Sequence, residues 1–250
     1  MITNTIFRTI TFTKQTIVDI AQIFIQILTL NFYRKQLLRS TIEISFYSLP
    51  VIFLTSFFTG AVLTMQASAG LSFLAGPATL SKIVVSAVVR ELGPVLTGLM
   101  ISGRIASALA AEISTMKVTD QIDALKTLRI NPSKLLIVPK VVAALISMPI
   151  LITISNVISM FGSWVIATQT LHYNGTLYAF AMFEHLKLFD FNIGILKAII
   201  FGFIITYVGT YSGMNSDGSS AGVGKSTTIA VVTSSILILV CNYIITFLFF

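Results

Sequence analysis

Five apolar stretches, each long enough to cross a lipid bilayer as a helix, constrain this sequence more than any other feature. They cover residues 44–66, 83–109, 138–167, 192–213 and 228–249. A hydrocarbon core about 30 Å thick requires roughly 20 apolar residues in a helix. Only 10% of the 250 residues are charged, whereas soluble domains contain about 25%. The sequence therefore predicts an all-α integral membrane protein with about five transmembrane helices.

Residues 15–31 differ from these stretches because polar side chains interrupt them at helical spacing. The polar side chains recur every three or four residues and are Gln15, Asp19, Gln22, Gln26 and Thr29. This spacing places them on one stripe of a helix, and basic residues flank the segment. Such a helix lies in the membrane interface more readily than it crosses the bilayer. We expect an N-terminal interfacial amphipathic helix, with a sixth, weakly apolar span as the alternative.

Lysine and arginine are distributed unevenly between the two sides of the membrane. Five lie before residue 40, five lie within 112–140, and one lies within 214–227. Because cytoplasmic connections carry the excess of basic residues, we place the N-terminus and these two connections in the cytoplasm and Phe250 on the far side. We also expect a short far-side helix around Leu177–Leu186. The basic residues sit beside apolar spans, which argues against nucleic acid as a partner.

The connection at residues 112–140 is the one well-charged block between apolar stretches. Within it, Thr119 can cap a short helix, with Asp120 and Asp123 near the positive end of the helix dipole. We expect Asn131-Pro132 to end this helix, because proline restricts the residue before it. A short capped helix between two spans offers a docking surface to a water-soluble partner. The alternative is a solvated helix that binds nothing.

Several unusual strings follow one another in the chain. They are Arg90-Glu91-Leu92-Gly93-Pro94, Ser102-Gly103-Arg104, Thr119-Asp120-Gln121-Ile122-Asp123-Ala124-Leu125, Val138-Pro139-Lys140 and Gly222-Val223-Gly224-Lys225. In this order they resemble the MlaE family, which comprises permease subunits of ABC transporters that move phospholipids between the membranes of double-membraned bacteria and of plastids. The resemblance covers roughly residues 42–250, which we expect to form a permease domain after an interfacial segment at 1–41.

The resemblance implies partners and a location as well as a fold. It implies a homodimer of this chain, a separate ABC ATPase subunit, a lipid-binding protein of the mammalian-cell-entry type on the far side and, in some systems, a STAS-type regulatory subunit. The implied substrate is phospholipid and the implied location is the bacterial inner membrane. No cofactor is expected, because ATP hydrolysis would take place in the partner subunit.

By the same resemblance, the short charged helix couples the permease to the ATPase. The coupling residues would be Thr119, Asp120, Gln121, Asp123, Ala124, Leu125 and Arg129. The related coupling motif of ABC importers has glycine at the position that Arg129 occupies here. A residue with a long charged side chain therefore replaces a small one at the end of the predicted helix.

Arg90, Glu91 and Lys197 lie inside apolar stretches, where a central charge costs about 2.5–3.5 kcal/mol. Arg90 and Glu91 precede Gly93-Pro94, and proline frees a backbone carbonyl one turn earlier, near Arg90. One hypothesis makes Arg90, Glu91 and Lys197 substrate-binding residues of a lipid cavity, with Arg90 near a phosphate. The alternatives are a structural ion pair at Arg90 and Glu91, and a Lys197 side chain that extends to the interface.

Other patterns carry less functional information. Small residues recur every four positions at Gly98, Ser102, Ala106 and Ala110, which predicts close packing between helices of one subunit. Residues 218–226 resemble a phosphate loop, but the spacing of their glycines departs from the pattern. We expect these residues to form a flexible loop before the last span.

Two further functions remain open at the level of sequence. An intramembrane lipid-modifying enzyme would use Glu91 or His185 as its catalytic group. Few polar groups lie in the spans, which disfavours a catalytic set. A scaffold or channel-like protein would need neither an ATPase nor the docking helix.

Overall fold

The computed structural model of the chain describes residues 34–70 and 76–249. Within these residues every regular element is a helix, and five helical stretches are long and apolar enough to cross a membrane. They are Lys35–Gly70, Pro77–Val118, Ser133–Gln169, Leu188–Met214 and Ser220–Phe249. The prediction of an all-α membrane protein with five spans is confirmed. The interfacial helix expected at 15–31 lies outside the described residues.

Shorter elements follow one another within these stretches. The first combines α2 (Arg34–Ser45), the turn η1 (Phe46–Ser48) and α3 (Leu49–Gly70). The second combines α4 (Pro77–Ala87), η2 (Val88–Leu92), α5 (Gly93–Ile101), η3 (Ser102–Ala106) and α6 (Ser107–Val118). The remaining elements are α7 (Gln121–Thr127), η4 (Ser133–Ile137), α8 (Val138–Gln169), α9 (Gly175–Glu184), α10 (Leu188–Met214) and α11 (Ser220–Phe249).

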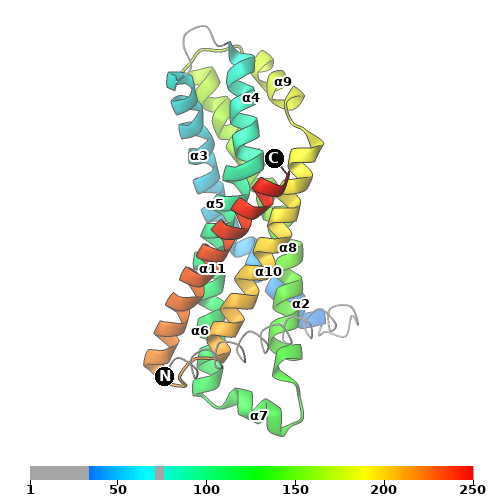
Figure 1. Cartoon of the computed structure of the whole chain (residues 1–250), viewed down its shortest axis with the longest axis vertical. Coiled ribbons are helices and arrows are strands. Elements are labelled where there is room, and N and C mark those ends of the chain that lie inside the picture. Colours follow the sequence, from blue (N-terminus) through cyan, green and yellow to red (C-terminus); the bar gives the residue numbers. More distant parts are fainter. Residues whose placement is uncertain (1–33, 71–75, 250) are drawn as a thin grey trace.

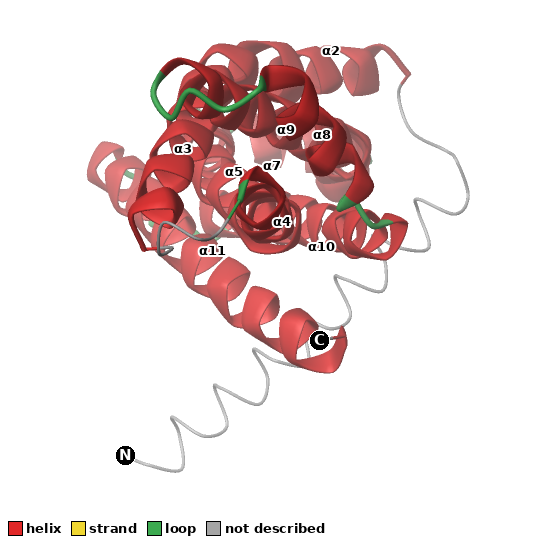
Figure 2. Cartoon of the chain, turned by 90° about the horizontal axis from the view of Figure 1, so that it is seen from above, coloured by secondary structure: helices red, strands yellow, loops and turns green. Residues whose placement is uncertain are grey.

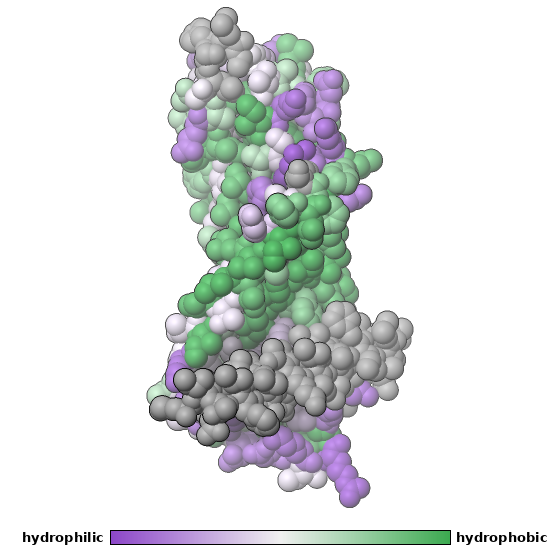
Figure 3. All heavy atoms as spheres, viewed as in Figure 1, coloured by the Kyte–Doolittle hydropathy of each residue, from purple (hydrophilic) through white to green (hydrophobic). Residues whose placement is uncertain are grey.

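The helices form an elongated bundle with different elements at its two ends. Figure 1 shows α9 and the outer ends of α3 and α4 at the top, and α7 at the bottom, beside the start of α11. Hydrophobic side chains cover the middle of the bundle and hydrophilic ones gather toward both ends (Figure 3). The two connections predicted to be cytoplasmic, those around α7 and between α10 and α11, therefore lie at the same end of the molecule.

The helices α3 and α8 pack so closely that their backbones touch. A Cβ atom added at Gly60 would lie 1.8 Å from the carbonyl oxygen of Ser159 on α8. A series of buried hydroxyl contacts, here called the hydroxyl ladder, runs beside this contact. It links Ser56 to Ser155 at 2.8 Å, Thr64 to Ser163 at 2.7 Å, and Ser163 to Tyr178 of α9 at 2.8 Å. Neutral hydroxyls thus satisfy one another where small residues let the helices approach.

The second span packs against α10 and α11 along the predicted stripe of small residues. Ser102 lies 2.6 Å from Ser234 of α11, measured between hydroxyl oxygens. A Cβ atom added at Gly209 of α10 would lie 3.0 Å from Cα of Ala106. The stripe therefore packs helices of the same subunit, as predicted. Seen from above, α11 lies at the edge of the bundle (Figure 2).

Two predictions about connecting segments fare differently. The short far-side helix is confirmed as α9, and Asn174 caps it by accepting hydrogen bonds from the amides of Thr176 and Leu177. The flexible loop expected at 218–226 is wrong, because α11 already begins at Ser220. The hydroxyl of Ser219 accepts a hydrogen bond from the amide of Gly222 at 3.0 Å. This contact satisfies one free amide of the first helical turn.

Candidate functional site

The first candidate site is α7, which protrudes at the lower end of the bundle in Figure 1. Its start differs from the prediction, because Thr119 does not cap it. The Thr119 hydroxyl instead donates to the carbonyl of Thr115 at 2.9 Å, at the end of α6. Asp120 occupies the cap position with a left-handed backbone, φ 56°. The sharp turn between two helices requires this conformation, and aspartate is one of the few residues that tolerate it.

The end of α7 also differs from the prediction. Its backbone shows what conformation Arg129 adopts at the position where the related motif has glycine. The helix ends at Thr127, four residues before Asn131. The amide of Ile130 donates to the carbonyl of Leu125 and that of Arg129 to the carbonyl of Lys126, both at 2.9 Å. These two bonds form a Schellman motif, whose left-handed position usually holds glycine. Arg129 fills that position with φ 59°, which is where the related motif has a glycine.

The outer surface of α7 is available to a partner. Ile122 is only 5% exposed and holds the helix against the bundle, whereas Leu128 is 69% exposed. Asp123 and Lys126 form an exposed ion pair at 2.8 Å. The hydrogen bond from Lys126, followed by its charge, lowers the pKa of the Asp123 carboxyl. The other predicted coupling residues are exposed, except Leu125, which is half-buried: Thr119, Asp120, Gln121, Ala124 and Arg129.

Two lysines join the spans that flank α7 to each other and to α10. The ammonium of Lys140, at the start of α8, lies 2.6 Å from the Glu112 carboxylate of α6, and the Lys140 side chain is 5% exposed. Lys117, at the end of α6, donates to the carbonyls of Met214 at 2.9 Å and Ser216 at 2.6 Å. From sequence, Lys117 is only one basic residue of a connection, and Lys140 is part of the Val138-Pro139-Lys140 string. Their contacts tie α6, α8 and the end of α10 together beneath α7.

The second candidate site lies inside the membrane and is centred on Lys197. Its side chain is 0% exposed, so the expected extension to the interface is wrong. The ammonium donates three hydrogen bonds, to the Arg90 carbonyl at 2.7 Å, to Glu91 Oε1 at 3.1 Å and to the Thr246 hydroxyl at 2.9 Å. An ammonium has three donors, and all three are therefore used.

The backbone of the second span supplies one of these acceptors. Pro94 has no amide hydrogen to donate to the carbonyl one turn earlier, that of Arg90. The amide of Gly93 bonds to the carbonyl of Val88, five residues back, which makes η2 a wide π turn. The predicted free carbonyl near Arg90 is thus present, and Lys197 of α10 occupies it. Wide turns of this kind often mark functional positions in helices.

Glu91 and Arg90 point to different partners, as their helical spacing requires. Glu91 accepts hydrogen bonds from the Thr246 hydroxyl at 2.7 Å and the Asn242 amide at 2.8 Å, in addition to Lys197. Arg90 Nε lies 3.0 Å from Asp190 Oδ2 at the start of α10. We call Arg90, Glu91, Asp190, Lys197, Asn242 and Thr246 the intramembrane polar cluster. It joins η2, α10 and α11 through two ion pairs and several hydrogen bonds.

Three members of this cluster are predicted site residues, Arg90, Glu91 and Lys197, whereas the partners Asp190, Asn242 and Thr246 were not predicted. Asn242 and Thr246 are four residues apart, so they share one face of α11, and that spacing within an apolar span was a usable signal.

His185, the other catalytic candidate, has its ring Nδ1 2.7 Å from the carbonyl of Ala181. Among the described residues, no group of three His, Cys, Asp or Glu side chains could hold a metal ion.

Comparison of the sequence with those of known proteins identifies a family. The model of the permease MlaE family matches residues 37–248. A probable ABC transporter permease protein of Rickettsia typhi is 46% identical over 218 residues, which is 87% of this chain and 84% of that protein. A probable ABC transporter permease protein of Synechocystis is 35% identical over 92% of this chain and 87% of its own length. One of Pyropia yezoensis is also 35% identical, over 81% of this chain and 77% of its own length. The chain, with its protruding α7 and its charges inside the membrane, belongs to the MlaE permease family.

Proposed function

We propose that this chain is the membrane subunit of an ABC transporter that moves phospholipid and is driven through α7 by a separate ATPase subunit. The observation that carries the proposal is an exposed helix, α7, whose two flanking spans are joined to each other and to the end of α10. In this proposal the chain hydrolyses nothing itself. The residues that contact the ATPase are those of α7 and its flanks, from Thr119 to Arg129.

The contacts beneath α7 support a transmission of movement. Lys140 and Glu112 join the two helices that flank α7, so a push on α7 moves α6 and α8 together. Lys117 joins the same unit to the end of α10. Rigid-body displacement of packed helices is a common way to carry a change from one site to another.

The second span carries the same displacement into the membrane. Helical structure is continuous from Pro77 to Val118, so α6 and Glu91 of η2 belong to one body. The far half of α10 holds Lys197, the partner of Glu91. A shift between the second span and α10 would therefore change the intramembrane polar cluster, which makes that cluster a suitable place for ATP-driven release of a lipid.

Arg90 and Glu91 are the members of the cluster that a lipid headgroup can reach. Their side chains are 33% and 36% exposed, whereas those of Asp190 and Lys197 are 5% and 0% exposed. A guanidinium binds phosphate and carboxylate with the same geometry. We infer that a phospholipid phosphate exchanges with Asp190 on Arg90, and that Lys197 acts indirectly by fixing Glu91.

We also propose the remaining partners that the family resemblance implies. A homodimer is supported by α11, because only 17% of its most apolar stretch is buried inside the chain. The rest of that stretch is free to pack against a second copy. A far-side lipid-binding protein of the mammalian-cell-entry type, a STAS-type regulatory subunit and a bacterial inner-membrane location complete the proposal. Residues 1–41 would form the interfacial segment before the permease domain.

Co-purification with the ATPase tests the docking step directly. Leu128→Asp places a charge on the exposed end of α7, and the expected result is loss of the ATPase and of ATP-dependent phospholipid transfer between vesicles. Leu188→Asp makes the same change at a similarly exposed position at the start of α10, where the exposed fraction is 77% compared with 69% for Leu128. It should leave the ATPase bound. Equal ATPase recovery with both variants, and unchanged transfer, would refute docking through α7.

A further inference from the structure

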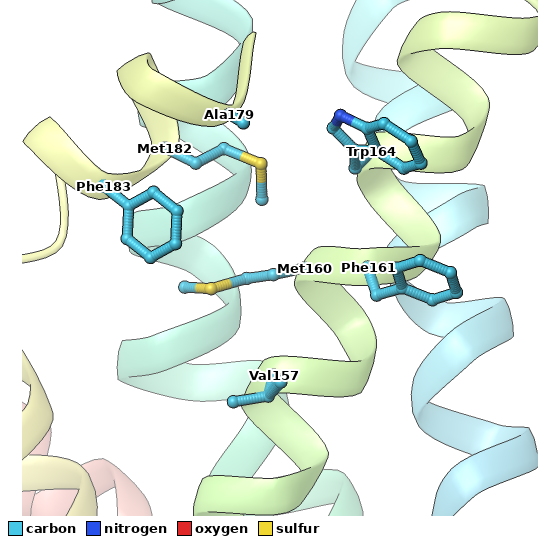
Figure 4. Close-up of a pocket in the computed structure, with 7 residues that line it drawn as sticks. All are labelled: Val157, Met160, Phe161, Trp164, Ala179, Met182 and Phe183. Carbon is cyan, nitrogen blue, oxygen red and sulfur yellow. The ribbon is translucent and has the colours of Figure 1, made fainter. Parts of the chain in front are cut away.

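A cavity of about 400 Å³ lies between α8 and α9, apart from the intramembrane polar cluster and from α7. Met160 extends from α8 into the space beside α9, and Met182 and Phe183 extend from α9 (Figure 4). The lining consists of these three residues with Val157, Phe161, Trp164 and Ala179. Two methionines give this lining an adaptable shape, because thioether side chains are unbranched and flexible.

The lining leaves a polar ligand no partner. Trp164 carries the one polar side-chain group in the set, and its Nε1 already donates to the carbonyl of Gly175 at 3.1 Å. The other six side chains are hydrocarbon or thioether. Water in a cavity needs two to four polar partners, which these residues do not provide. The cavity therefore suits an apolar guest.

The surroundings of the cavity indicate which apolar guest reaches it. The large side chains on the outer face of α9 are strongly exposed, with Leu177 at 61%, Phe180 at 76% and Phe183 at 77%. On α8, a membrane span, Val157 is 62% exposed. Side chains of this kind at a bilayer face hydrocarbon. The opposite face of α9 is fixed to the bundle by the hydrogen bond between the hydroxyls of Tyr178 and Ser163. The wall of the cavity that α9 forms is therefore held in place.

We propose that the cavity between α8 and α9 binds one acyl chain of a membrane lipid. If a methylene group takes up roughly the volume of a water molecule, about 30 Å³, the cavity holds about a dozen of them. A helix of a partner protein is about 10 Å wide with a pitch of 5.4 Å, so about 400 Å³ holds no more than roughly one turn of it. The lipid's polar end lies outside, in the interface beside α9. This site is separate from the transported phospholipid and does not depend on the proposed function.

The single tryptophan of the chain makes the cavity measurable. The purified full chain, in detergent micelles, is titrated with a phosphatidylcholine that carries bromine midway along one acyl chain. Bromine quenches tryptophan on contact, so we expect Trp164 fluorescence to fall and to saturate near one lipid per chain. The same lipid with a nitroxide quencher on the choline should quench far less.

A matched pair of variants separates the cavity from ordinary lipid contact. Val157→Phe fills the cavity and should abolish the saturable phase, while Val240→Phe, on the exposed side of α11, should retain it. Quenching that rises linearly with bromolipid, or a saturable phase that persists in Val157→Phe, would overturn the proposal. Stronger quenching from the headgroup label would also overturn it, and that comparison needs only the wild-type chain.

Discussion

Two helix contacts in this protein solve the same problem, how to bury polar groups in a membrane, in different ways. Between α3 and α8 the polar groups are neutral hydroxyls, and glycine lets the backbones touch. Between η2, α10 and α11 they are charged, and Lys197 is fully enclosed. Neutral pairs in membranes contribute only about 0.6 kcal/mol on average, whereas each central charge costs several times that amount.

We infer from this difference that the first contact is structural and that the second serves the proposed transport. The hydroxyl ladder and its glycines explain a tight, fixed pair of helices with no further requirement. The charged cluster is an expensive way to pack helices, since apolar residues of similar volume would serve as well. Two of its helices, the second span and α10, are also joined by Lys117 beneath α7. We therefore regard α3, α9 and the outer half of α8 as the frame. We propose that the second span, α10, α11 and the start of α8, which Lys140 joins to α6, form the working part.

The largest expected effect comes from breaking the charged cluster on one side. Lys197→Met leaves Glu91 without its cation, and removal of one partner of a buried pair costs about 3–5 kcal/mol. The midpoint of thermal unfolding in detergent should fall sharply. Glu91→Gln added to Lys197→Met should recover much of the stability but none of the lipid transfer. A stable single variant would show that the cluster contributes little to the fold.

A single methyl group at the α3–α8 contact should come next. Gly60→Ala places a Cβ atom 1.8 Å from the Ser159 carbonyl oxygen, and overpacking of this kind costs about 1–3 kcal/mol. Gly103→Ala is the matched control, because nothing lies within 4 Å of a Cβ atom there. Similar unfolding temperatures for the two variants would mean that the close contact is absent in the protein.

A smaller effect, in the stabilising direction, is expected at the end of α7. Arg129→Gly relieves a left-handed backbone that costs a non-glycine residue about 1 kcal/mol. Hydrogen exchange of the Arg129 and Ile130 amides, which close the Schellman motif, should slow down. Faster exchange at these amides would contradict the motif.

The smallest effect concerns one step of the hydroxyl ladder. Ser56→Ala removes the contact with Ser155, and we expect a loss of about 0.6 kcal/mol with unchanged lipid transfer. Transfer assays and thermal unfolding on the same preparation check both parts. Lost transfer with retained stability would move the ladder from the frame to the working part.

More of the fold than of the sites could be predicted from the sequence. Apolar runs and the four-residue recurrence from Gly98 to Ala110 are local patterns, so they predicted the spans and one packing face. The partners of Lys197 could not be read in this way, since Glu91 and Thr246 lie 106 and 49 residues from it. The predicted limits of α7 were wrong for another reason. The left-handed turns at Asp120 and Arg129 outweighed the capping signal of Thr119 and the proline signal of Pro132.

The most direct test of the whole account exchanges the charges beneath α7. Lys140→Glu alone should leave the ATPase bound and hydrolysing ATP, but should sharply reduce the phospholipid moved per ATP in reconstituted vesicles. Adding Glu112→Lys restores an ion pair between α6 and α8 and should recover most of that transfer. Undiminished transfer in Lys140→Glu, or a folded double variant that stays inactive, would contradict transmission through this base.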